Sequence, residues 1–261
     1  MEIMNVKKLP KVIILAAGAG NRLRPYTADR PKCMLELGGK ALIDRQLHTL
    51  RSCGLTDISI ITGYLKGKVE ALGYPTVENP AWEITNMVMS LWCAFDRLKE
   101  DIIISYADII YQRSVLETLL ACNADMAVVV DCGFRKYWEF RFENPLDDLE
   151  SLAISPDDCI QSIGQKVESM DEIEAQYIGL MRFKGDGLKN LKKHMVSISR
   201  TEKFAKMYMT DLLQDIINHG ECIKAVKINH GWLEFDSVED FLVSQKLLED
   251  RTISKFFDLS K

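Results

Sequence analysis

The most informative part of the chain is Lys11–Pro25, KVIILAAGAGNRLRP, and Arg30–Met34, RPKCM, follows it closely. The short apolar run at Val12–Ala16 is typical of a central parallel strand. It leads into a loop with glycine at positions 18 and 20, where no side chain blocks close approach. Backbone N–H groups of such a loop are free to face phosphate oxygens, so the stretch predicts a loop that wraps a triphosphate.

Basic residues follow these glycines. Arg22 and Lys32 supply the positive charge that a leaving pyrophosphate needs, and Pro31 restricts the chain beside Lys32. The chain does not match two other glycine-loop motifs. Leu23 stands where G-x-G-x-x-G requires its third glycine, and G-x-x-x-x-G-K-[ST] is absent from the sequence. The remaining alternative is an ordinary strand-to-helix turn. In that case the arginine, the proline and the Pro-Lys pair would all be present by coincidence.

Composition narrows the class of protein. The chain has 261 residues, 47% hydrophobic and 27% charged, which suits one large globular domain. A net charge of −5 argues against a nucleic-acid partner. No apolar run approaches the roughly 20 residues of a membrane span, and the first ten residues lack the apolar core of a signal peptide. We therefore expect a cytoplasmic protein with small-molecule partners and no membrane partner; a homodimer is one assembly that the sequence allows.

Cysteine and histidine usage gives no metal signal. The seven cysteines are an odd number and no two form C-x-x-C, so we expect reduced thiols rather than disulfides or a zinc site. The four histidines, at 48, 194, 219 and 230, have no ligand spacing. We expect each to be a surface or core residue.

Apolar runs alternate with amphipathic stretches along the chain. We expect strands at 12–16, 58–62, 102–106, 126–130, 176–183, 222–228 and 232–235, and helices at 41–52, 84–98, 113–122, 186–197, 209–219 and 237–249. This alternation predicts an α/β fold with a doubly wound, mixed but mostly parallel sheet. We expect a single domain over 1–261, with a nucleotide-binding half at 11–130 and an acceptor-binding half at 131–261 that includes a small lid. Residues 134–160 mix aromatics with charge and carry no clear pattern.

Carboxylates stand where two of the expected strands end. Asp108 follows one strand, and Asp236 follows another, with Glu234 two residues earlier on the same strand face. Ligands of open α/β sheets bind beyond the carboxyl ends of strands, and Mg²⁺ prefers carboxylate, phosphate and water oxygens. These three acids are therefore candidate Mg²⁺ ligands. The alternative for each aspartate is a turn residue or a helix cap, and Asp236 precedes an expected helix.

The opening stretch resembles the signature of sugar-phosphate-type nucleotidylyltransferases, L-A-A-G-x-G-x-R-L-x-P ending in P-K. The resemblance implies that acidic residues at positions 108 and 236 meet across the site and hold the metal. It also implies that a lysine before a strand, here Lys166, neutralises the phosphate of the acceptor. A solvated surface charge is the alternative for Lys166.

Further stretches resemble a narrower group, the small cytidylyltransferases that act on phosphocholine, aminoalkylphosphonates or phosphoglutamine. The stretches are Gly63-Tyr-Leu, Asn86-Met, SYAD ending at Asp108, NPLDD at 144–148, AQYIGL at 175–180, MYMTD at 207–211 and WLEFD ending at Asp236. The phosphocholine branch matches less well, because it tends to have an acidic residue where this chain has Tyr106.

The expected contacts to CTP come from the loop and two later positions: Leu15, Ala16, Ala17, Gly18, Ala19, Gly20, Gly63 and Asn86. Backbone groups near Ala16 and Gly63 would read cytosine together with the Asn86 amide, which can donate to its O2 and N3. A helix cap is the equal alternative for Asn86.

The expected acceptor pocket is lined by Arg135, Trp138, Arg141, Tyr177 and Tyr208. Arginine forks suit a phosphonate or carboxylate, and aromatic faces suit an ammonium group. The alternative for any of these aromatics is the core.

These residues and the resemblance together predict an enzyme, a nucleotidyltransferase that moves CMP from CTP to a small amino-bearing phosphate or phosphonate and releases pyrophosphate. Mg²⁺, Lys32 and Arg22 would offset charge on the triphosphate, and Lys166 would hold the acceptor oxygen in line. One alternative is a hexose-1-phosphate nucleotidylyltransferase that uses UTP or dTTP. The other is a non-catalytic nucleotide sensor or scaffold.

Overall fold

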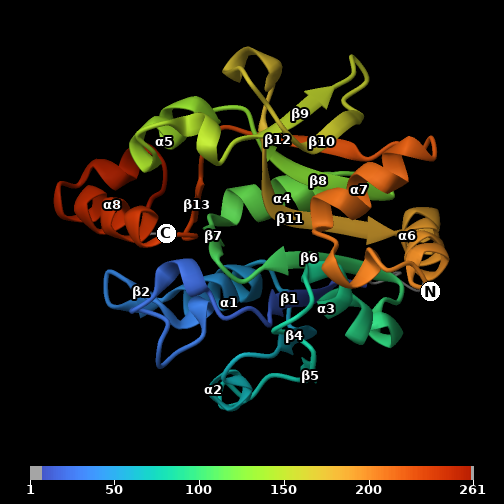
Figure 1. The fold of residues 1–261 in the computed structure, drawn as a ribbon, viewed down its shortest axis with the longest axis horizontal. Helices are drawn as coiled ribbons and strands as arrows, with labels where there is room; N and C mark the ends of the chain where they lie inside the picture. Colours follow the sequence, from blue (N-terminus) through green and yellow to red (C-terminus); the bar gives the residue numbers. More distant parts are fainter. Residues whose placement is uncertain (1–7, 260–261) are drawn as a thin grey trace, which may run out of the picture.

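A seven-stranded sheet forms the centre of the computed structural model, which describes residues 8–259 (Figure 1). Its order is β12-β8-β11-β6-β1-β4-β5. The strands are β1 (Lys11–Ala16), β4 (Ile58–Thr62), β5 (Thr76–Glu78), β6 (Asp101–Tyr106), β8 (Met126–Asp131), β11 (Gln176–Lys184) and β12 (Lys224–Ile228). Only β11 runs antiparallel to its neighbours in this sheet. The predicted α/β fold with a mixed, mostly parallel sheet is confirmed.

Helices cover both faces of the sheet. Successive residues of each strand point to opposite sides, so each strand contributes side chains to both faces. Val12 and Ile14 of β1 belong to one buried cluster, and Ile13 and Leu15 belong to the other. The first cluster includes residues of α1 (Leu42–Ser52), α2 (Lys66–Glu70), α4 (Arg113–Ala121), α5 (Phe134–Arg141) and α8 (Val238–Glu249). The second includes residues of α3 (Met87–Cys93), α6 (Gly185–Ile198) and α7 (Met209–Asn218), which lie on the right in Figure 1.

Three two-stranded sheets complete the fold. β2 (Glu36–Leu37) pairs with β3 (Lys40–Ala41), β7 (Ile109–Tyr111) with β13 (Trp232–Glu234), and β9 (Glu150–Ile154) with β10 (Ile160–Lys166). All three pairs are antiparallel. The second pair joins the two halves of the chain, because β7 follows β6 directly and β13 comes near the C-terminus.

The sequence did not predict α2, β2, β3, β5, β7 or β10, and two longer stretches also differ from the expectation. The helix expected at 84–98 is shorter, because Asn86 caps α3 at its start and the chain continues after Cys93 as a 3₁₀ turn, Phe95–Arg97. The stretch 134–160, which carried no clear pattern, forms α5, the 3₁₀ turn Pro145–Asp147 and strand β9. The hairpin of β9 and β10 packs on α7.

The expectation of seven reduced thiols is wrong for one pair. A disulfide joins Cys159, at the turn of the β9–β10 hairpin, to Cys222, just before β12, with 5.4 Å between their Cα atoms. A pairing across 63 residues leaves no local pattern in the sequence. The other five cysteines are free thiols.

None of the helices within residues 8–259 is long and apolar enough to cross a membrane.

Candidate active site

The pairing of β7 with β13 brings two of the predicted acids together. Glu234 lies opposite Ile109 in this pair, and the Phe235 N–H donates to the Asp108 carbonyl oxygen at 3.1 Å. Asp108 and Asp236 therefore meet at the end of one short ribbon, next to the loop after β1. Asp236 does not cap the last helix. Ser237 does so instead, with its hydroxyl accepting from the Asp240 N–H.

The Lys32 ammonium lies between these two carboxylates. Its Nζ donates to Asp108 Oδ2 at 2.6 Å and to Asp236 Oδ1 at 2.5 Å. Burial by itself would lower the pKa of Lys32, but the attraction of the two carboxylates outweighs it and raises the pKa. The lysine is therefore a fixed positive charge at physiological pH.

Arg22 adds a second cation. It lies in the 3₁₀ turn Asn21–Leu23 and pairs with Asp236 through its guanidinium, while most of its side chain stays exposed. Burial would raise the pKa of Asp236, but Lys32 and Arg22 lower it. Asp236 is thus held as a carboxylate between two cations.

The donor set fits a divalent cation. Asp108 Oδ1 is buried and accepts no hydrogen bond, whereas Asp236 pairs through Oδ1 with Lys32 and through Oδ2 with Arg22. Two carboxylates with room for water and phosphate oxygens are what Mg²⁺ prefers. Glu234 is placed differently, since its Oε2 lies 3.0 Å from Arg141 Nη1. Burial raises the pKa of Glu234 to about 8, and Arg141 opposes this rise.

Arg141 is a positioning residue and not part of a pocket wall, contrary to the sequence expectation. Its guanidinium forms a fork to Asp240, at 2.9 and 3.1 Å, and Asp240 Oδ2 accepts from the N–H groups of Asp236 and Ser237. Arg141 is only 3% exposed. It therefore fixes the chain that carries Glu234 and Asp236.

A first cavity of about 410 Å³ opens over the glycine loop. Its walls include six of the eight residues predicted to contact CTP: Leu15, Ala16, Ala17, Gly18, Gly20 and Asn86. Arg22, Lys32, Asp108 and Asp236 line it as well. The predicted loop and the predicted charged residues thus share one cavity.

The glycines of this site serve different purposes. Gly20 has a φ of +62°, and a Cβ there would lie 3.0 Å from the Lys32 Cβ, so this glycine lets Lys32 pack against the loop. A Cβ at Gly18 would meet nothing within 4 Å, and its φ is not in the left-handed region. Within residues 8–259, no close contact requires glycine at 18, and this glycine lines the cavity.

The other two predicted CTP contacts lie outside the cavity wall. Ala19 is buried beneath the loop. Gly63 packs beneath Trp82, and a Cβ there would lie 2.6 Å from both Trp82 and the Ala17 carbonyl oxygen. Gly63 therefore supports the wall through Trp82, which does line the cavity.

Asn86 is a helix cap, the alternative that the sequence left open, and it also lies on the cavity wall. Its side-chain oxygen caps α3 by accepting from the Met87 N–H at 2.9 Å, and the residue also lines the first cavity. Sequence reasoning missed its neighbours Thr85 and Ser90. Buried Asn79 places both, because its Nδ2 donates to their hydroxyls at 2.9 and 3.0 Å.

A second cavity, of about 540 Å³, adjoins the first. Four residues line both cavities: Arg22, Met87, Tyr208 and Asp236. Four predicted acceptor residues line the second: Lys166, Trp138, Tyr177 and Tyr208. Arg135 is turned elsewhere, because its guanidinium donates to the backbone oxygens of Met170 and Ile173.

Acidic residues in this second wall were missed by the sequence analysis. Asp147, Asp148 and Glu150 line it together with Glu234 and Asp236, against two cationic residues, Arg22 and Lys166. Burial raises the pKa of Asp148 and of Glu150. The second cavity therefore has an acidic, aromatic wall. NPLDD at 144–148 was noted as a resembling stretch, but nothing in its pattern placed it on a wall.

Comparisons with known proteins place this fold and site in a family. The family model of the MobA-like NTP transferase domain matches residues 12–170. A CTP:phosphoglutamine cytidylyltransferase of Campylobacter jejuni is 38% identical over 247 residues, which is 88% of this chain and 97% of the relative. A choline-phosphate cytidylyltransferase of Streptococcus pneumoniae is 36% identical over 244 residues, 92% of this chain and 99% of the relative.

A solved structure of a CTP:phosphocholine cytidylyltransferase from Streptococcus pneumoniae shares the fold. It superposes with a TM-score of 0.71 over 91% of this chain and 98% of that chain, at 23% identity.

The chain is a nucleotidyltransferase. It belongs to the MobA-like NTP transferase domain family, and the resemblance to cytidylyltransferases that the sequence predicted is confirmed.

Gly18 offers a direct test of the first cavity. We expect Gly18→Ala to weaken nucleoside triphosphate binding about ten- to hundredfold, because a methyl group forced into a filled site costs roughly 1–3 kcal/mol. Thermal stability should not change. Isothermal titration with CTP and a melting curve measure the two effects. Gly67→Ala is the matched control, since a Cβ there also meets nothing within 4 Å and Gly67 lines neither cavity. Equal CTP affinity in both variants would show that the phosphates do not approach Gly18.

Proposed function

We propose that the protein transfers CMP from CTP to a phosphate or phosphonate oxygen of a small amino-bearing acceptor, with phosphoglutamine the first candidate, and releases pyrophosphate. One observation carries this proposal: the two cavities meet at Arg22 and Asp236, next to the buried Lys32–Asp108 pair. Two substrates bound side by side would have their reacting atoms at this junction.

The first cavity suits CTP. Backbone N–H groups of the glycine loop are available for phosphate oxygens, and Lys32 and Arg22 carry the charge to offset a leaving pyrophosphate. Asn86, Thr85 and Ser90 supply hydrogen-bonding side chains on the wall formed by α3 and the loop before it. The names of both full-length relatives support cytidine as the base.

The second cavity suits an acceptor with an amino group. Its excess of acidic over basic residues favours a cation, and Tyr177 and Tyr208 offer aromatic rings. Lys166 is exposed at the end of β10 and lines this cavity, so it is available for the acceptor phosphate. A neutral hexose has no charge to match this wall.

A divalent cation, Mg²⁺ first, would be held by Asp108 and Asp236. When bound, it supplies positive charge to the phosphate oxygens. The unsatisfied Asp108 Oδ1 supports this assignment. Glu234 would stay outside that set, because it pairs with Arg141.

In the proposed reaction, an acceptor oxygen forms a bond to the α-phosphorus of CTP as the bond from that phosphorus to the pyrophosphate oxygen breaks. The acceptor oxygen is already an anion, so no general base is required. The protein aligns the two substrates and neutralises charge. Lys32 and Arg22 would face the pyrophosphate, and Lys166 would orient the acceptor.

Asp108→Asn tests the charged site. We expect turnover at saturating Mg²⁺ to fall at least about a hundredfold, because a charged ligand is lost from a nearly isosteric side chain. The melting temperature should show that the fold survives. Asp57→Asn, at an exposed aspartate between α1 and β4, is the matched control and should keep full activity. Near-normal turnover of Asp108→Asn would remove this residue from the reaction.

A substrate panel tests the identity of donor and acceptor. We expect CTP to exceed UTP by about tenfold or more in kcat/KM, because a site that hydrogen-bonds cytosine leaves groups unpaired against uracil. Phosphoglutamine, 2-aminoethylphosphonate or phosphocholine should exceed glucose 1-phosphate. Pyrophosphate release measures every pair.

The panel also separates the alternatives. If glucose 1-phosphate with UTP or dTTP were the best pair, nucleotidyl transfer would stand and the amino-bearing acceptor would be wrong. Binding of CTP without turnover of any acceptor would favour a nucleotide sensor.

A further inference from the structure

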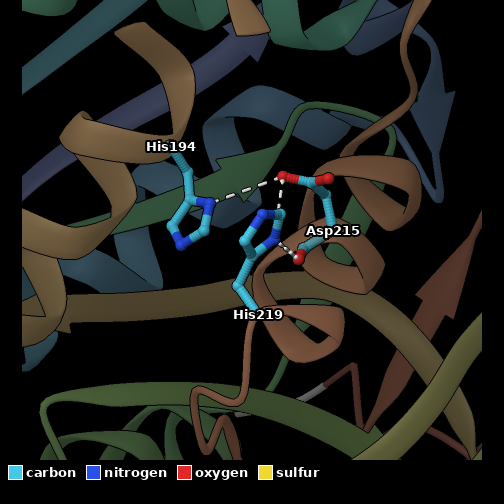
Figure 2. A group of neighbouring side chains, drawn as sticks. All are labelled: His194, Asp215 and His219. Carbon is cyan, nitrogen blue, oxygen red and sulfur yellow. Dashed lines mark hydrogen bonds and ion pairs between the residues drawn. The ribbon is translucent and has the colours of Figure 1, made fainter. Parts of the chain in front are cut away.

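Two histidines and an aspartate gather where α6 meets α7 (Figure 2). His194 lies on α6, Asp215 lies on α7, and His219 is the C-terminal cap of α7. None of the three lines either cavity of the active site. Asp215 and His219 are four residues apart and so share one helix face, whereas His194 comes from a different helix and escapes any sequence pattern. From the sequence alone we expect surface or core histidines, and nothing there predicts this cluster.

The three side chains have the spacing of metal ligands. Asp215 Oδ2 lies 3.4 Å from His194 Nδ1 and 3.8 Å from His219 Nδ1. One donor atom from each residue lies within 4.8 Å of the other two donors. Zinc bonds of about 2.0–2.1 Å in a tetrahedron place donor atoms roughly 3.4 Å apart. The first pair already has this separation. His219 Nδ1 also hydrogen-bonds the Asp215 carbonyl oxygen at 2.8 Å, so the exposed His219 ring must turn to offer a free ring nitrogen to the metal.

A second observation points to a ligand. Asp215 Oδ2 is buried from solvent and accepts no hydrogen bond, although it lies between the two imidazoles. Within residues 8–259, no lysine or arginine pairs with this carboxylate. Among the described residues, only the two imidazoles pair with this oxygen, at 3.4 and 3.8 Å, and a cation bound there would stabilise the buried carboxylate.

We propose that His194, Asp215 and His219 form a binding site for a divalent transition metal of the Zn²⁺ type, separate from the active site. Imidazole nitrogens suit Zn²⁺, Co²⁺, Ni²⁺ and Cu²⁺, whereas the all-carboxylate pair in the active site suits Mg²⁺. Three protein ligands leave one tetrahedral position for water. The His219 side chain is 60% exposed, so solvent reaches this end of the cluster.

Such a site would link two helices of the protein. The metal would tie the middle of α6 to the C-terminal end of α7. The N-terminal end of α7 follows Tyr208, which lines both cavities, and Gln214 of α7 accepts from the Ile163 N–H of β10. A bound metal would therefore stabilise the helix that supports the second cavity.

The test is a titration of the metal-free protein with Co²⁺ in excess Mg²⁺, which occupies carboxylate sites. We expect one equivalent of Co²⁺ to give the visible bands of tetrahedral coordination, Zn²⁺ to displace it, and Zn²⁺ to raise the melting temperature. His194→Ala and His219→Ala should each weaken Co²⁺ binding at least about tenfold and abolish the rise in melting temperature. His48→Ala, at an exposed histidine on α1, is the matched control and should bind like the wild type.

Either of two results would overturn the proposal. The first is unchanged Co²⁺ binding and unchanged Zn²⁺ stabilisation in both His194→Ala and His219→Ala. The second is a wild-type protein that gives no Co²⁺ bands. Because His219 is exposed, its variant folds without loss of a core contact, so lost binding in that variant reports ligation. Asp215→Asn checks the third ligand and should weaken binding while keeping the shape of the side chain.

Discussion

The site depends on the contact of one ammonium with two carboxylates, Lys32 with Asp108 and Asp236. These three groups come from the loop after β1, the end of β6 and the end of β13, so their attraction ties together segments that are far apart in the sequence. These side chains are only partly buried, and removing one of them leaves its partners charged and unpaired beside the cavity. The same contact lowers the pKa of Asp236 and so holds this acid as a carboxylate before any cation arrives.

A second ion cluster supports the first from behind. Arg141 pairs with Asp240 and Glu234, and Asp240 in turn accepts from the backbone of Asp236. The guanidinium lies 4.6 Å from the centre of the Trp138 ring, and Trp138 lines the second cavity. Residues expected in the acceptor pocket thus act on it in two ways: Trp138 forms its wall, and Arg141 fixes the carboxylates beside it.

Sequence reasoning succeeded where a local pattern decides the structure. The strand at 58–62 and the glycine loop before Arg22 follow directly from their apolar runs and turn residues. It failed where burial comes from distant partners. Arg141 was expected to line the acceptor pocket, because nothing in the sequence shows that Asp240 packs against it. Asp148 and Glu150 enter a pocket wall only after the β9–β10 hairpin forms. The disulfide of Cys159 and the cluster around Asp215 likewise join separate elements.

We propose that donor and acceptor bind in adjoining cavities and react directly at their junction. The stereochemistry at the α-phosphorus tests it most directly, with CTP that carries a sulfur of known configuration on that atom and the best acceptor of the panel. A single in-line transfer across the junction predicts inversion of configuration in the product. Retention would require two displacements through a covalent enzyme intermediate, and it would contradict direct transfer between the two cavities.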